Sequence, residues 1–120
     1  IFEMELVALL SSKDKESWPQ VAGLIKHGEW EKIFIVGDDE AKSFSSDKKF
    51  EFIKVNFDQR IKDLRDDLIK KLKGKFDELE VGLSIASGSG KEHMALISAL
   101  INIPIGIRFA ALTKEGIVDL

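Results

Sequence analysis

The stretch VGLSIASGSGKEHMALISALIN, residues 81–102, is the part of the chain that decides the fold. It opens with a short apolar run, residues 81–86, of the kind that forms a strand buried on both faces of a sheet. A glycine-rich loop at residues 87–91 leads into a helix-like segment that ends before Pro104. A buried strand followed by a tight loop and a helix is the repeating unit of parallel α/β folds.

Strand-like and helix-like segments alternate along the rest of the chain in the same way. Apolar runs predict strands at residues 6–10, 33–36, 50–57, 105–112 and 116–120. The first predicted helix begins at Ser17, because Ser17 and Gln20 have the spacing of a capping box. The second spans residues 58–75 with Asp58 as its expected N-cap, and a single helical turn is expected at residues 40–44.

This alternation predicts one α/β domain over residues 1–120, with a doubly wound, Rossmann-like, mainly parallel sheet and helices on both faces. The natural strand order is 3-2-1-4-5-6, with the last strand antiparallel at the far edge and the third strand at the other. The order reverses between the first and fourth strands, so a ligand should bind at the loops that follow them. Gly82, Ser84 and Ala86 share one face of the fourth strand, where their small size is expected to let a helix pack closely.

Composition excludes several classes of function. The chain has no cysteine and only two, widely separated histidines, so we expect neither disulfides nor a metal site. Its apolar runs are shorter than the ~20 residues of a membrane span, and its start shows no signal-peptide pattern, so the cytoplasm is the expected location. The net charge of −3 argues against general nucleic-acid binding. A solvated helix face is therefore the favoured interpretation of the lysines near the end of the second helix: Lys70, Lys71, Lys73 and Lys75.

The loop at residues 87–91 is the strongest candidate for a binding site. Its glycines allow close approach to the backbone, the helix start supplies free N–H groups, and Lys91 adds a positive charge, a combination that suits a phosphate. It is not a Walker A loop, because Ile85 and Glu92 stand where that motif requires a glycine and a hydroxyl residue. The alternative is a tight turn whose glycines only permit packing. Across the predicted crevice, Ser11 and Ser12 follow the first strand and offer two hydroxyls.

Other polar residues give weaker signals. Asp38 and Asp39 end the second strand and could hold a ribose or a divalent ion, although a capping role is favoured. His93 follows the glycine loop by one helical turn, where packing or exposure is favoured over catalysis. Trp18 and Trp30 flank the first helix and are expected in the core or at its rim. The pattern contains no hydrolase triad, and no cofactor is predicted.

The segment LSIASGSGKEHMAL, residues 83–96, resembles the signature of CRISPR-associated Rossmann-fold (CARF) domains. In that family a strand ends in a Thr-Gly-Gly-Thr-Lys-like loop that precedes a helix of small residues and methionine. The order of elements, including the terminal hairpin, is also similar over the whole chain. The sequence departs from the pattern in its interleaved glycines, in the missing asparagine before the loop, and in the first-strand loop, which lacks the usual glycine or proline.

This resemblance implies a two-fold dimer that binds a cyclic oligoadenylate across its axis. The residues carried over to the ligand are those of the two loops: Ser11, Ser12, Ser87, Gly88, Ser89, Gly90 and Lys91. Some members of the family also cleave the ring slowly without metal, and Lys91 and Ser11 would carry that reaction here. The alternative is a non-enzymatic α/β regulatory or subunit module whose glycine loop binds another anion or nothing.

Overall fold

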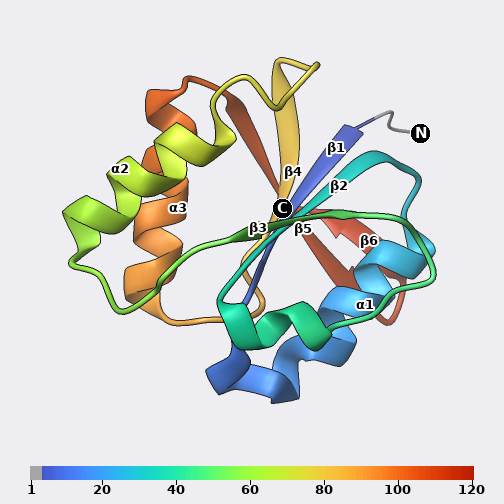
Figure 1. The fold of residues 1–120 in the computed structure, drawn as a ribbon. Coiled ribbons are helices and arrows are strands. Elements are labelled where there is room, and N and C mark those ends of the chain that lie inside the picture. The colour runs from blue at the N-terminus through green and yellow to red at the C-terminus, as the bar shows by residue number, and fades with distance from the viewer. Residues whose placement is uncertain (1–3) are drawn as a thin grey trace.

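A computed structural model describes residues 4–120 as a six-stranded sheet with helices on both of its faces (Figure 1). Residues 1–3 of the predicted domain, including the chain start on which the signal-peptide prediction rests, lie outside the described residues. The strands are β1 (Met4–Leu10), β2 (Trp30–Gly37), β3 (Glu51–Lys54), β4 (Glu80–Ser84), β5 (Gly106–Thr113) and β6 (Gly116–Asp119). The helices are α1 (Trp18–His27), α2 (Ile61–Leu72) and α3 (Gly90–Asn102), with 3-10 segments η1 (Ser12–Ser17) and η2 (Asp39–Ser43).

The strand order confirms the predicted topology. The sheet runs β3-β2-β1-β4-β5-β6, with parallel pairing from β3 to β5 and an antiparallel β5–β6 hairpin at the edge. The chain leaves β1 toward β2 on one side and returns to β4 on the other, so β1 and β4 flank the switch point. None of the helices formed by residues 4–120 has the length and apolar character needed to span a bilayer.

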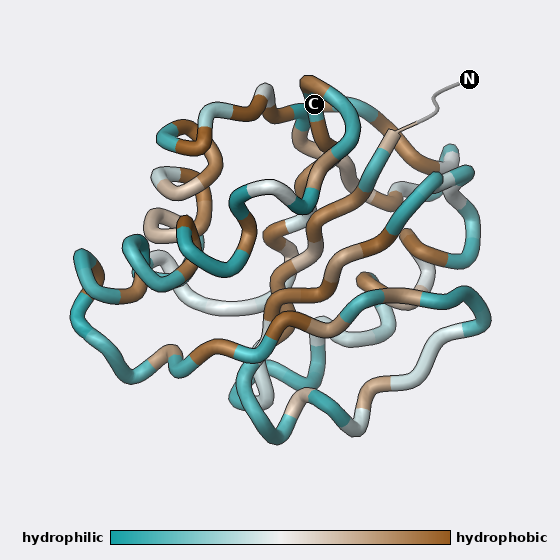
Figure 2. Tube along the Cα trace, turned by 45° about the horizontal axis from the view of Figure 1, so that its top comes forward, coloured by the Kyte–Doolittle hydropathy of each residue, from teal (hydrophilic) through white to brown (hydrophobic). Residues whose placement is uncertain are grey.

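β1 supplies side chains to two separate cores. Leu6, Ala8 and Leu10 join α1 on one face of the sheet, while Val7 and Leu9 join α2 and α3 on the other. Figure 1 shows α2 and α3 side by side, away from α1. Apolar residues gather along the central strands, and hydrophilic residues occupy much of the outer loops (Figure 2). This two-sided burial explains why the strand reads as a continuous apolar run.

One predicted helix start is confirmed and one is wrong. Ser17 is the N-cap of α1, as expected, but its hydroxyl donates to the Asp14 carbonyl across 2.7 Å and Gln20 donates to Leu112, so the expected capping box does not form. The second helix begins at Ile61, because the Asp58 N–H donates to the Asn56 side chain across 2.9 Å. Such local side-chain bonds compete with the first turn of a helix.

The strands also differ from the prediction at their ends. β3 stops at Lys54 and β4 at Ser84, each short of the predicted end. Gly82 lines one cavity, and Ser84 and Ala86 line another together with Gln20 and Leu24 of α1. The expected close packing of a helix on these small residues stays a prediction.

Candidate functional site

The loops after β1 and β4 meet at the switch point, as the sequence predicts. The Ser11 N–H donates to the Ser87 hydroxyl across 3.0 Å, and the Gly88 N–H donates to the Asp14 carboxylate across 3.2 Å. These two bonds join loops that lie more than 70 residues apart in the chain. The geometry therefore brings together the two segments from which a ligand site was expected.

The Ser87 hydroxyl holds the two loops together, and neither Ser11 nor Ser87 is open to solvent. Ser87 is fully buried, and Ser11 is 4% exposed. The Ser11 hydroxyl also accepts from the Lys13 N–H across 3.2 Å, which caps η1. The Ser12 hydroxyl and N–H both donate to the Asp38 carboxylate, which lies at the end of β2.

The two glycines of the loop have different structural roles. Gly88 adopts a φ of +99°, and a Cβ placed on it would lie 2.3 Å from a methyl group of Leu9. Among residues 4–120, no heavy atom outside the local chain lies within 4 Å of the corresponding position on Gly90. Gly88 is therefore required by packing and backbone conformation, while Gly90 leaves open space at the first turn of α3.

Carboxylates occupy the N–H groups of the glycine loop. Asp14 accepts from the Gly88 N–H, and Glu92 accepts from both the N–H and the hydroxyl of Ser89, across 2.9 and 2.8 Å. Glu92 thus binds back to the N-cap of its own helix in a capping box. The sequence interpretation missed this role, although the Ser-x-x-Glu spacing of residues 89–92 carries the signal. The role of Asp14 has no local signal, because its partner lies 74 residues away.

The Lys91 ammonium lies against the loop between β3 and α2. It donates to the Phe57 carbonyl across 2.6 Å and to the Gln59 carbonyl across 2.9 Å. The side chain is therefore not directed at the N–H groups with which it was expected to converge. It instead joins the start of α3 to the residues that precede α2.

The remaining candidate residues also have protein partners. Asp39 forms ion pairs with Lys42 and Lys54, and its hydrogen bond to Lys42 is the main reason that the pKa of its carboxyl is lowered. Within residues 4–120, no three acidic or histidine side chains gather as a group able to hold a metal ion. A ring nitrogen of His93 lies 2.8 Å from the Ser87 carbonyl, which gives this half-buried histidine a structural contact.

Together these residues form a set of hydrogen-bond donors at the carboxyl end of the sheet, and each donor binds an oxygen atom of the protein itself. The acceptors on the glycine loop are ionised side chains, so these donors already act as receptors for anions. A scan against models of protein families found no match, and a search of curated proteins found no relative.

Proposed function

We propose that the chain is a CARF-like domain that binds a cyclic oligoadenylate, or a related anionic nucleotide, at the loops after β1 and β4. One observation carries this proposal: the N–H groups of Gly88 and Ser89 and the Ser89 hydroxyl are aligned on carboxylate oxygens. A phosphate oxygen makes the same charge-assisted bonds to such donors. The carboxylates of Asp14 and Glu92 stand where ligand oxygens would bind.

In this proposal, a phosphate of the ligand replaces the carboxylates of Asp14 and Glu92 at the glycine loop. A phosphate takes over the Gly88 and Ser89 donors, while Asp14 and Glu92 turn toward water. The open space beside Gly90 admits the ligand to the first turn of α3, whose dipole favours negative charge. Lys91 exchanges the carbonyls of Phe57 and Gln59 for the phosphate. Any cleavage of the ring requires that same exchange, since Lys91 is the cation assigned to the developing charge.

The dimer is part of the same proposal and follows from the resemblance. One copy supplies a single glycine loop, whereas a cyclic ligand with repeated phosphates fits two loops related by a two-fold axis. Closed two-fold pairs are also the commonest form of homo-oligomer. Sedimentation at micromolar concentration should give twice the monomer mass, and a monomer alone would contradict the symmetric site.

A second candidate is a non-enzymatic regulatory module whose glycine loop serves only as a structural turn. The observation in its favour is that the polar groups of the loop already have hydrogen-bond partners within the protein. Ser11 and Ser87 are buried and bonded to each other, and Lys91 has two carbonyl partners. In this case the carboxylates of Asp14 and Glu92 are permanent caps and not stand-ins for a ligand.

Thermal unfolding with and without ligand separates the two candidates. Cyclic tetra-adenylate and cyclic hexa-adenylate are each added at increasing concentration, with linear oligoadenylates of the same length as controls. A ligand at a hundredfold excess over its Kd adds roughly 2.7 kcal/mol to the stability of the folded state. A rise in Tm with a cyclic ligand, larger than with its linear control, supports the CARF-like function. No shift with either ring at millimolar concentration supports the structural turn.

A further inference from the structure

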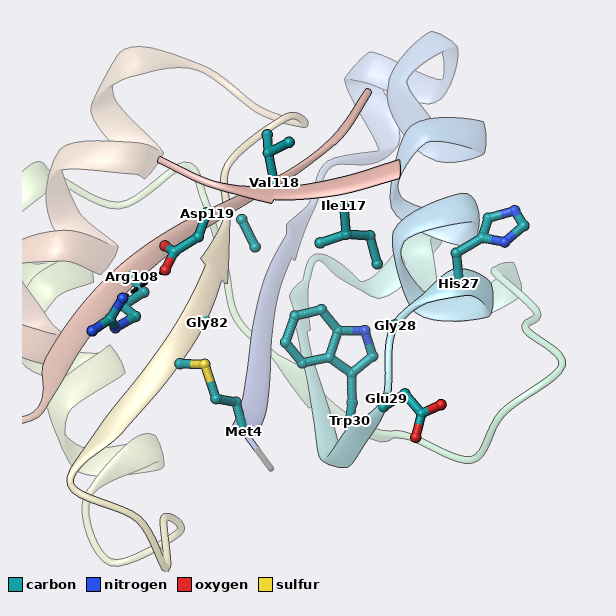
Figure 3. Close-up of a pocket in the computed structure, with 11 residues that line it drawn as sticks. Met4, His27, Gly28, Glu29, Trp30, Gly82, Arg108, Ile117, Val118 and Asp119 are labelled. Atoms are coloured by element: carbon teal, nitrogen blue, oxygen red, sulfur yellow. Dashed lines mark hydrogen bonds and ion pairs between the residues drawn. The ribbon is translucent and has the colours of Figure 1, made fainter. Parts of the chain in front are cut away.

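A cavity of about 310 Å³ lies between β6 and the amino-terminal ends of β1 and β2. Met4 and Trp30, the first residues of those two strands, line it together with Ile117 of β6 (Figure 3). The glycine loop lies at the carboxyl end of the same sheet, so this cavity is separate from the proposed nucleotide site. It has no role in the function proposed above.

The cavity exists because small residues form its floor. Leu6, Gly82 and Arg108 lie in register across β1, β4 and β5, and Ala110 follows on β5 opposite Asp119. α1 packs over Leu6, while Gly82 and Ala110 line the cavity. A Cβ on Gly82 would lie 3.0 Å from the Trp30 ring, so the glycine lets the ring lie over β4.

Trp30 is held in a fixed position as one wall of the cavity. Its indole N–H donates to the Leu24 carbonyl across 3.0 Å, and a Cβ on Gly28 would lie 2.1 Å from that nitrogen. Figure 3 shows Met4 and Ile117 around the ring, with Arg108 and Asp119 on one side of it. A rigid aromatic wall lowers the entropic cost of binding a flat molecule.

The polar edge of the cavity offers a donor and an acceptor side by side. Arg108 donates to Asp119 across 2.6 Å and to Glu80 across 2.7 Å, which raises the pKa of the guanidinium, with the Glu80 bond the larger cause. Those bonds leave further guanidinium N–H groups and the second Asp119 oxygen to bind a ligand. Arg108 carries the positive charge of the lining, against negative charges on Asp119 and Glu29, so the cavity disfavours an anion.

We propose that this cavity binds a small, uncharged, planar heteroaromatic molecule with an adjacent hydrogen-bond donor and acceptor. Its ring lies against Trp30 and Met4, and its polar edge pairs with Arg108 and Asp119. The volume of about 310 Å³ is roughly twice that of a ~150 Å³ cavity that takes one benzene ring, so two fused rings fit. The apolar lining supplies affinity, and the Arg108–Asp119 edge fixes orientation.

Nuclear magnetic resonance of the whole chain tests this with 7-azaindole, a neutral two-ring probe that has the required donor and acceptor. The chain has two tryptophans, so its indole N–H signals are two, and Trp18→Phe assigns the one from Trp30. We expect saturable shifts of the Trp30 indole and Gly82 amide signals with a Kd of about 1 mM or tighter. Indole, which lacks the acceptor, should bind several-fold more weakly, and the anion indole-3-acetate more weakly still.

Ala110→Leu fills the cavity from its floor and should weaken 7-azaindole binding at least ~tenfold. Ala111→Leu adds the same group to the next residue of β5, which does not line this cavity, and should leave the affinity unchanged. Gly82→Ala is the second filling variant if Ala110→Leu loses its dispersed spectrum. The site is overturned if 7-azaindole gives no saturable shift, or if it binds a folded filling variant as well as the original chain. Tightest binding by indole-3-acetate would overturn the ligand class.

Discussion

The Asp14 carboxylate accepts a hydrogen bond from the Gly88 N–H across 3.2 Å, and it thereby places a negative charge on the loop proposed to bind an anion. Asp14→Asn keeps an acceptor at this position and removes the charge. We expect it to raise the affinity for cyclic oligoadenylates about fivefold, because a like charge ~4 Å away costs roughly 1 kcal/mol in water. Calorimetric titration measures the change. Asp47→Asn, in the loop before β3, is the matched control, and an unchanged affinity for the Asp14 variant would show that Asp14 does not compete with the ligand.

Lys91→Ala should weaken binding of an anionic nucleotide by about tenfold to a hundredfold, since a hydrogen bond to a charged group contributes roughly 1.5–3 kcal/mol. The fold should survive, because Lys91 is exposed and its two partners are loop carbonyls. Lys70→Ala, on the exposed side of α2, should change little. Equal affinity of the Lys91 variant and the original chain for every bound nucleotide would favour the structural turn.

A comparison of Gly88→Ala with Gly90→Ala distinguishes a glycine that close packing requires from one that lies beside open space. Gly88→Ala should lower the free energy of unfolding by roughly 1–3 kcal/mol or more, because its φ is +99° and the new Cβ would clash with Leu9. Gly90→Ala enters open space at the start of a helix and should be neutral or stabilise by up to ~1 kcal/mol. Urea denaturation measures both. Equal effects of the two substitutions would mean that Gly88 has no special role in the turn.

The buried Glu5 holds the segment that leads into β4. One oxygen of its carboxylate accepts from the N–H groups of Asp77 and Glu78, each across 3.0 Å, while the other is buried with no hydrogen-bond partner among residues 4–120. Glu5→Ala should destabilise the fold by roughly 2–4 kcal/mol, because it leaves both N–H groups without their acceptor and leaves a cavity. Glu5→Gln keeps an accepting oxygen and should cost less in the same denaturation experiment. A larger loss for Glu5→Gln would point to the carboxylate charge, and not to the acceptor, as the stabilising element.

Asp39 should titrate below the ordinary range of an aspartate. Its hydrogen bond to Lys42, followed by the charge of Lys54, lowers the pKa of its carboxyl. A carboxyl with a lowered folded-state pKa contributes stability above its unfolded pKa, and this is lost as the pH falls through the folded value. The contribution is small because the side chain is exposed. Carbon-detected titration of Asp39 should show its midpoint rise in Lys42→Met, whereas an unchanged midpoint would contradict the assigned cause.

The sequence predicts the topology because runs of neighbouring residues identify the strands that set it. Buried runs such as residues 6–10 and 81–86 identify the central strands, and the handedness of crossovers then leaves few possible orders. Element ends were predicted less well, since they depend on single bonds such as that from the Asp58 N–H to Asn56. A pattern of apolar residues carries no information about such local competition.

The approach of the two candidate loops follows from the sequence, and the contacts between them do not. That loops 11–15 and 87–91 approach each other follows from the strand order alone. That Asp14 binds Gly88 does not, because the two residues share no local pattern. The direction of Lys91 is also absent from the sequence, because the carbonyls that it binds, those of Phe57 and Gln59, lie more than 30 residues away in the chain.

The pairing of Ser11 with Ser87, across 76 residues of chain, also determines when the site can exist. β1 is made first and can pair with β2 soon afterward, but its other edge stays open until β4 has left the ribosome. During that interval an apolar central strand presents an unpaired edge, which is the kind of edge that recruits other chains. Closing so large a loop is slow, and the contact between the two loops is therefore among the last features of the nascent protein to form.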